Sequence, residues 1–360
     1  ACQRRGTMDL PLTARDAGLA LVFALATGAS TWFIARWAAR LPRRHVAPFD
    51  TNQRPSDDGA TPEGGTIGIL AVALPLMAAI IWLFEPTNRV PWAAIGAALA
   101  LTVAAGVVDK RGVHVLVKLG LQGLAVAAVL ALLPGKFLVF QGLVPLVFDR
   151  IMTGLAWIWF INQIALMDGI DGLTGTEITA IGTGVFTIAA LIGAQGGGGA
   201  SLVGLSGLVL AASAGGFLIL NWYPARVRLS QGGTLALGFL TGWLLITLAT
   251  WGYWVATLIL PAYYLADTTI TLALGAKRGR SAGAVRGEYF YQRAVARGWS
   301  PGRVARLIAG GNVMLIILAA VSTQVISITG DALCLTGGGT VVALMLHWLA
   351  RAEPADITPP

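Results

Sequence analysis

Apolar blocks of roughly 20 residues recur along the whole chain, and they leave few possible folds. A helix of about 20 residues is long enough to cross a hydrocarbon core of ~30 Å. The 360 residues are 56% hydrophobic and only 12% charged, whereas soluble domains carry about 25% charged residues. A soluble domain of this length would have to hide more apolar surface than its volume allows. The sequence therefore predicts an all-α, polytopic transmembrane helix bundle that forms one integral-membrane domain over residues 1–360.

Ten to eleven membrane spans are predicted, because some of the apolar blocks are short or rich in glycine. The blocks cover residues 17–36, 66–84, 91–108, 114–134, 151–167, 176–195, 200–220, 233–247, 250–270, 304–325 and 332–349.

Positive charge is concentrated in alternate loops of this predicted bundle. The odd-numbered loops carry most of the Arg and Lys residues, with a long basic segment over 277–303. The even-numbered loops contain Arg89, Lys136 and Arg150 and little else. The positive-inside rule places the odd loops in the cytoplasm. The net charge of +8 thus marks a cytoplasmic face, and it does not indicate a nucleic-acid partner.

Two acids follow the fifth apolar block in the segment Met167-Asp168-Gly169-Ile170-Asp171-Gly172. A spacing of three residues places Asp168 and Asp171 on one face of a helical turn. Carboxylates at a membrane boundary are costly unless they are paired or bind a cation, and Mg²⁺ prefers oxygen ligands. Capping of the next helix is an equally good interpretation of these two residues.

Polar side chains at the neighbouring helix ends have similar alternatives. Asp109 ends the third block, as a functional carboxylate or as a solvated loop acid. Lys118 lies one turn into the fourth block, where it could hold a phosphate or extend to the membrane surface. Asn162, inside the fifth block, needs a hydrogen-bonding partner, so it either bridges two helices or contributes to a site with Asp168.

Further polar segments lie in the same predicted cytoplasmic loops. The glycine-rich segments over 61–66 and 229–234 each precede an apolar block, where backbone amides either bind phosphate or simply begin a helix. Residues 289–293 are aromatic and amphipathic, as in a helix at the level of the lipid headgroups. The three histidines are scattered, and neither they nor the two cysteines have the spacing of a metal site.

Taken together, these motifs resemble the polyprenyl-phosphate N-acetylhexosamine-1-phosphate transferase family, also called glycosyltransferase family 4. The family pattern runs P-N-x-R-x-x-H-x-x-P-T-P-x-G-G, then D-D, K-L-x-x-Q, N-x-x-N-x-M-D-G-x-D-G, N-x-P-P-A and G-D-x-G-S. The matching residues here are Asn52, Arg54, Thr61, Pro62, Gly64, Gly65, Asp109, Lys118, Gln122, Asn162, Asp168, Gly169, Asp171, Gly172, Asn221, Pro224, Ala225 and Gly233. The segment Phe290-Tyr291-Gln292-Arg293-Ala294 is similar to F-Y-Q-R-A in a proteobacterial branch.

The resemblance implies transfer of a sugar 1-phosphate from a UDP-N-acetylhexosamine to undecaprenyl phosphate, at the cytoplasmic face of a bacterial inner membrane. It implies catalytic roles for Asp109, Lys118 and Asp168, and a Mg²⁺ site that uses Asp171 and Gln231. It also implies substrate-binding residues, namely Asn52, Arg54, Asn162, Asn221, Gln292 and Arg293. The family permits a homodimer surrounded by membrane lipids.

Three positions depart from the family pattern. Lys110 replaces the second acid of D-D, Ala165 replaces the second Asn of N-x-x-N, and Gln231 replaces the acid of G-D-x-G-S. Two like unit charges 4 Å apart repel by about 1 kcal/mol even in water, so positive charge added beside a Mg²⁺ ion weakens its binding. The sequence therefore also allows an alternative function, a catalytically impaired relative that binds lipid phosphate or a partner enzyme.

Overall fold

The computed structural model describes residues 14–40, 61–110, 115–194, 200–285, 287–325 and 327–352, and it contains only helices and their connections within these ranges. The helices are α1 (Ala14–Ala38), α2 (Gly65–Phe84), α3 (Arg89–Lys110), α4 (Val115–Leu132), α5 (Leu146–Met167), α6 (Leu173–Ala194), α7 (Ala200–Asn221), α8 (Gln231–Thr250), α9 (Trp254–Ile259), α10 (Ala262–Lys277), the 3₁₀ helix η1 (Ala282–Val285), α11 (Phe290–Ala296), α12 (Pro301–Ser322) and α13 (Ile328–Ala350).

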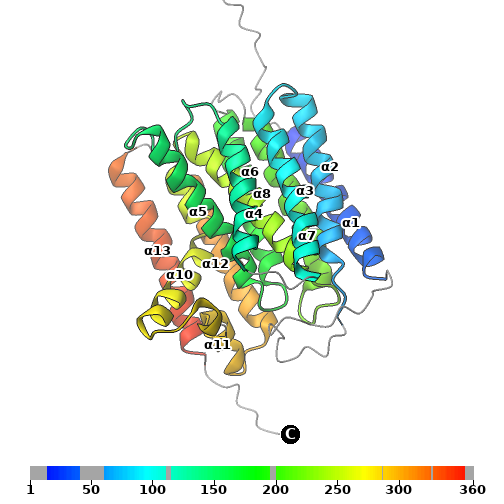
Figure 1. The fold of residues 1–360 in the computed structure, drawn as a ribbon, viewed down its shortest axis with the longest axis vertical. Helices are drawn as coiled ribbons and strands as arrows, with labels where there is room; N and C mark the ends of the chain where they lie inside the picture. The colour runs from blue at the N-terminus through cyan, green and yellow to red at the C-terminus, as the bar shows by residue number, and fades with distance from the viewer. Residues whose placement is uncertain are drawn as a thin grey trace, which may run out of the picture.

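The long helices stand side by side as one bundle, with α11 and the end of α10 at its lower end in Figure 1. Helix α8 lies at the centre, where Phe239, Leu240 and Leu244 are fully buried. Helix α1 lies at the edge, where Leu19 and Leu25 are exposed. This arrangement matches the expected fold class, because apolar side chains of a membrane bundle face lipid as well as the protein core.

Small residues allow the central helices to approach closely. A Cβ atom on Gly182 of α6 would lie 2.6 Å from the carbonyl oxygen of Gly207 in α7, which is too short for a real contact. Small residues at such positions let helix backbones meet in lipid, where no hydrophobic effect drives helices together. The abundance of glycine within the apolar blocks therefore has a structural cause at this contact.

Nine of the described helices are long and apolar enough to cross a membrane, namely α1, α2, α3, α4, α6, α7, α8, α12 and α13. Helix α5 has the same length as several of these, 22 residues, but it is less apolar because it carries Asp149, Arg150, Asn162 and Gln163. The structure differs from the sequence prediction at 250–270, where a continuous span was expected. Leu260 and Pro261 separate α9 from α10, and Pro261 has no N–H group to continue the helical hydrogen bonding.

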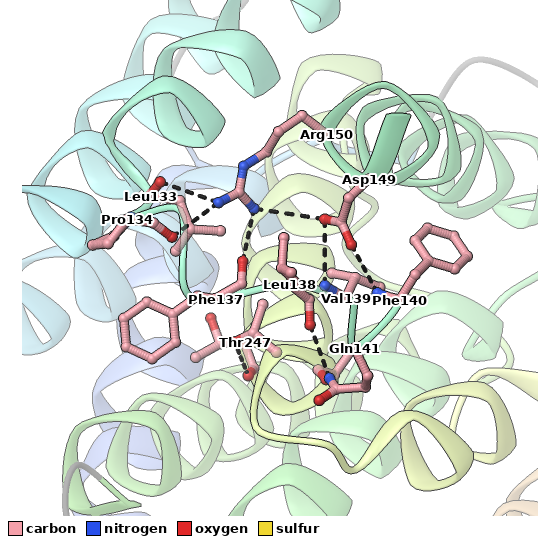
Figure 2. Close-up of polar contacts among 12 residues, drawn as sticks. Leu133, Pro134, Phe137, Leu138, Val139, Phe140, Gln141, Asp149, Arg150 and Thr247 are labelled. Atoms are coloured by element: carbon pink, nitrogen blue, oxygen red, sulfur yellow. Dashed lines mark hydrogen bonds and ion pairs between the residues drawn. The ribbon is translucent and has the colours of Figure 1, made fainter. Parts of the chain in front are cut away.

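The connection from α4 to α5, at the opposite end of the bundle from α11, is held by Asp149 and Arg150 (Figure 2). The fully buried carboxylate of Asp149 accepts hydrogen bonds from the amides of Val139 and Phe140, at 3.4 and 2.8 Å. The Arg150 guanidinium lies 3.7 Å from this carboxylate. It also donates to the carbonyl oxygens of Leu133, Pro134 and Phe137, at 3.2, 3.0 and 2.9 Å.

Candidate active site

Several of the predicted site residues within the described part of the chain lie at or near the ends of α3, α5, α7 and α8. Helix α3 ends where α4 begins, and α5 ends where α6 begins, so both connections lie at one end of antiparallel pairs. Helix α8 begins at the same end, because a Cβ atom on Gly232 would lie 3.2 Å from the carbonyl oxygen of Thr102 near the end of α3. These three polar segments therefore lie at one end of the bundle.

The turn between α5 and α6 contains the two acids. Asp168 is the C-cap residue of α5, and its Oδ1 accepts a hydrogen bond from the Thr174 hydroxyl at 2.8 Å. Gly172 has a φ of +79°, a backbone conformation that glycine adopts without steric cost. We define this segment, residues 168–172, as the acidic turn. The acidic turn therefore places Asp168 directly after α5 and Asp171 two residues before the start of α6.

The acidic turn is bonded to the loop between α7 and α8. Asp171 Oδ2 accepts from the amide of Ala225 at 3.0 Å, and its Oδ1 lies 4.0 Å from Nε of Arg228. Buried Asn221 accepts from the amide of Gly172 at 3.0 Å and donates to the carbonyl oxygen of Val227 at 2.9 Å. Asp171 and Asn221 therefore hold the acidic turn against the α7–α8 loop. This structural role does not depend on a bound ligand.

The two glycine-rich helix starts also contact each other. The amide of Gly65 donates to the carbonyl oxygen of Arg228 at 3.0 Å, so the start of α2 lies against the α7–α8 loop. Ser230 is the N-cap of α8, and its amide donates to the Thr66 hydroxyl at 3.0 Å. A side chain on Gly233 would collide with Thr66. The glycines therefore allow the starts of α2 and α8 to pack closely, and the backbone amides form hydrogen bonds between these two segments.

Helix α11 covers the acidic turn from another side. A Cβ atom on Gly169 would collide with the Tyr291 hydroxyl and would lie 2.9 Å from Nε2 of Gln292. Gln292 Oε1 accepts from the amide of Gly287 at 2.8 Å, and the Arg293 guanidinium stacks on the Phe290 ring at 4.3 Å. The predicted amphipathic helix is confirmed as a helix, and its Gln292 reaches the acidic turn.

Asn162 and Lys118 lie along α5 and α4. Asn162 donates to Oε1 of Gln122 at 2.6 Å and to the carbonyl oxygen of Ile158 at 2.7 Å. The two amide side chains therefore bridge α4 and α5, one of the two roles considered for Asn162. Lys118 is half-buried and lines a small cavity with Ala105 of α3 and Leu235 of α8. It thus lies between three helices near the end of the bundle that carries the acidic turn.

Some predicted residues cannot be compared with the structure. Asn52 and Arg54 lie outside the described residues, as do the side chains of Asp109, Lys110 and Gln231. Their assigned roles, and those of the other site residues, remain predictions.

The acidic turn offers carboxylate oxygens, which Mg²⁺ prefers, but too few of them to surround the ion. No group of three or more His, Cys, Asp or Glu side chains is gathered for metal binding within the described ranges. Asp171 already has an amide and an arginine beside its carboxylate. A magnesium ion here would therefore take few protein carboxylates and complete its shell with water and substrate phosphates, as Mg²⁺ commonly does.

Several polar residues behind the acidic turn were not singled out by the sequence. Glu177 of α6 and Asn312 of α12 are both buried and joined by a 2.7 Å hydrogen bond. Thr174, which bonds to Asp168, comes three residues before Glu177. Their position directly after the D-G-x-D-G segment could have identified Thr174 and Glu177 in the sequence, because an acid inside an apolar block needs a partner.

Comparison with known proteins adds an independent finding. The sequence model of glycosyl transferase family 4 matches residues 92–249. Phospho-N-acetylmuramoyl-pentapeptide-transferases of Bacillus thuringiensis (strain Al Hakam) and Bacillus cereus (strain AH187) are each 34% identical to this chain over 143 residues. The alignment covers 37% of this chain and spans 42% of the length of each of these relatives. The family match runs from α3 to the end of α8 and so includes the acidic turn, whereas α11 lies beyond it.

Proposed function

We propose that this chain transfers a sugar 1-phosphate from a UDP-N-acetylhexosamine to undecaprenyl phosphate. The match of residues 92–249 to glycosyl transferase family 4 and the similarity to phospho-N-acetylmuramoyl-pentapeptide-transferases support this proposal. The products are undecaprenyl-diphospho-sugar and UMP, and the product lipid serves synthesis of a cell-envelope polysaccharide. The chain acts as a multi-pass protein of the bacterial plasma membrane, with its site at the cytoplasmic face. The excess of Arg and Lys in the odd-numbered loops supports this orientation.

The proposed reaction exchanges one phosphoanhydride bond for another. An oxygen of the lipid phosphate attacks the β-phosphorus of the UDP-sugar, and the bond between this phosphorus and the oxygen bridging to UMP breaks. UMP leaves with that oxygen and the electron pair. Both reactants are anions, so the site must reduce their repulsion and hold them in line, which is how proteins accelerate such transfers.

Cationic side chains of the site would reduce the repulsion between the two reactants, and acidic side chains would help to orient them. Half-buried Lys118 supplies positive charge near a phosphate. Asp109 would orient the lipid phosphate or accept its proton, and Asp168 would organise the donor side of the site. Arg228, held 4.0 Å from Asp171, adds a second cation beside the acidic turn.

Asp171 and Gln231 would hold a magnesium ion, together with substrate oxygens and water. When bound, the ion would offset negative charge on the phosphate oxygens. Gln231 offers a carbonyl oxygen without charge, so we expect weaker metal binding than in a site with an aspartate there.

One structural observation supports the proposal most strongly. The acidic turn is bonded to residues 49 and 54 positions further along the chain, at the end of α7 and in the α7–α8 loop, and its Gly169 lies against α11. The hydrogen bonds that join them use side chains at positions of the family motifs. A pocket for two phosphorylated reactants requires such a convergence of distant segments at one end of the bundle.

Release of UMP tests the proposed function directly. Purified protein in detergent or nanodiscs is incubated with undecaprenyl phosphate and UDP-N-acetylglucosamine or related UDP-N-acetylhexosamines, with and without Mg²⁺. We expect UMP release that requires the lipid, increases with Mg²⁺ and is lost in Asp109→Asn. Absence of turnover with every donor would contradict the proposal.

A catalytically impaired relative is the second candidate function. Lys110, Ala165 and Gln231 favour it, because they remove two acids and an amide of the family pattern. Such a protein would bind undecaprenyl phosphate without releasing UMP from any donor. Measured lipid-phosphate binding in the absence of turnover would therefore favour this candidate over the first.

A further inference from the structure

Helix α11 is too short to be stable without support from the rest of the protein. It has seven residues, Phe290–Ala296, whereas isolated helices shorter than about 12 residues are marginal in water. Its Tyr289 N-cap position makes no side-chain cap hydrogen bond. Because the first amides of a helix have no partner within it, another part of the molecule must fix where α11 begins.

Asp267 of α10 supplies this support. Its side chain is fully buried, and its Oδ1 accepts from the amide of Phe290, the first residue of α11, at 3.0 Å. The same oxygen accepts from the Thr271 hydroxyl at 3.2 Å, while Oδ2 accepts from the Tyr263 hydroxyl at 3.0 Å. These three donors, together with the backbone amide of Tyr291, hold one carboxylate at the start of α11.

The residues that follow Phe290 connect this anchor to the acidic turn. Tyr291 is fully buried and stacks on Tyr289 with ring centres 5.9 Å apart. The Tyr291 hydroxyl and the Gln292 amide lie where a side chain at Gly169 would be. Gly169 is the residue between Asp168 and the rest of the acidic turn, so a shift of α11 would move Gln292 relative to Asp168.

We propose that Asp267 is a positioning residue for the phospho-sugar site: it holds the start of α11 so that Tyr291 and Gln292 lie against the acidic turn. The proposal rests on the proposed function for its effect on turnover, and its structural part stands independently. Asp267 itself acts through α11 and makes none of the substrate contacts predicted for Gln292 and Arg293.

The kinetic test compares Asp267→Ala with Asp267→Asn. Asp267→Ala removes every acceptor, whereas Asp267→Asn keeps one oxygen for the Phe290 amide. We expect Asp267→Ala to raise KM for the UDP-sugar at least tenfold, and Asp267→Asn to stay within threefold of the original protein. Simple loss of folded protein would lower apparent kcat and leave KM unchanged.

The matched control is Thr268→Val, the neighbouring change on α10. The Thr268 hydroxyl is fully buried and makes no hydrogen bond in the described structure, and valine has nearly the same shape. We expect KM and kcat of this variant to stay within twofold of the original values. An equal rise in KM for Thr268→Val and Asp267→Ala would overturn the specific role of Asp267.

Cysteine labelling tests the position of α11 without using activity. Ala294 of α11 and Ala305 of α12 are both fully buried. Each is changed to cysteine in a background of Cys2→Ser and Cys334→Ala, and its reaction with a water-soluble maleimide is timed. We expect Asp267→Ala to accelerate labelling at position 294 at least tenfold and to leave position 305 protected, while Asp267→Asn keeps both protected.

Each result tests a different part of the proposal. Protection of position 294 in Asp267→Ala overturns the anchoring of α11, and exposure of 294 with an unchanged KM overturns its importance for the site. Equal exposure of 294 and 305 indicates general unfolding and also overturns the proposal. If the original protein turns over no donor, the proposed function fails, and labelling still determines whether Asp267 holds α11.

Discussion

At both ends of the bundle an aspartate accepts hydrogen bonds from loop amides and has an arginine beside it, but the two aspartates hold different parts of the chain. Asp149 bonds to amides only 9 and 10 residues away and is fully buried. Asp171 bonds to an amide 54 residues away, and 14% of its side chain is exposed. The first aspartate shapes one loop, whereas the second joins distant segments and is partly exposed.

This difference separates a structural role from a functional one. The α4–α5 loop and its two charged residues form a closed set of contacts, in which Arg150 bonds to three carbonyl oxygens of the same loop (Figure 2). The acidic turn instead collects the α7–α8 loop and α11 around it. We therefore expect substitutions at the α4–α5 end to reduce stability, and substitutions in the acidic turn to reduce turnover.

The largest effect is expected for Asp168→Asn. Loss of the carboxylate removes an electrostatic contribution at the reacting phosphates, and single contributions of this kind are worth about 100- to 1,000-fold in rate. UMP release per folded protein should fall by about this factor, with an unchanged apparent melting temperature in detergent. Turnover within a factor of ten of the original would show that Asp168 has no catalytic role.

Asp149→Asn should have the second largest effect, on stability alone. Asp149 is fully buried whereas Arg150 is partly exposed and keeps its carbonyl partners, so loss of this carboxylate charge costs about 1 to 3 kcal/mol. The free energy of unfolding, measured by denaturation with SDS in mixed micelles, should fall by about this amount. Turnover per folded protein should be unchanged, and a fall in turnover as deep as that of Asp168→Asn would remove the distinction between the two ends.

A smaller effect is expected for the amide pair between α4 and α5. Interhelical hydrogen bonds in membrane proteins are worth about 0.6 kcal/mol on average and up to about 1.7 kcal/mol. In a double-mutant cycle of Gln122→Leu and Asn162→Leu, the coupling free energy should fall in this range. A rise in KM confined to Asn162→Leu would support its predicted role in substrate binding, and a coupling of zero would argue against the bridge.

An effect of similar small size is expected for Ser230→Ala at the start of α8. Ser230 accepts from the amide of Gly233 at 3.3 Å and contacts the Thr66 hydroxyl at 2.9 Å. Loss of an N-cap costs typically about 1 kcal/mol. Thermal unfolding should therefore begin at a slightly lower temperature, and Thr66→Val, which leaves the cap in place, should have a smaller effect.

The sequence predicts the helices well because apolar length alone determines them. Expected blocks such as 66–84 and 200–220 agree with α2 and α7 to within one residue at each end. The break between α9 and α10 was also readable, since Pro261 lies inside the block expected over 250–270. A proline inside a helix removes a hydrogen bond and collides with the preceding turn.

The partners of the site residues could not be predicted in the same way. Nothing in the sequence near Asp171 indicates that it accepts from the amide of Ala225, because that contact depends on how α6 and α7 pack. Likewise, the link from Asp267 to Phe290 crosses 23 residues and a change of helix direction. The sequence identifies polar and charged residues at helix ends, but the packing of the helices determines which of them come into contact.

The central claim is that the site lies at the end of the bundle that faces the cytoplasm, and sealed membrane vesicles test it most directly. The UDP-sugar cannot cross a membrane, so it is supplied outside inverted and right-side-out vesicles that contain the protein, and UMP is measured in the outer solution. We predict UMP release with inverted vesicles and none with intact right-side-out vesicles until they are permeabilised. Equal release from both, or release only from right-side-out vesicles, would contradict the account.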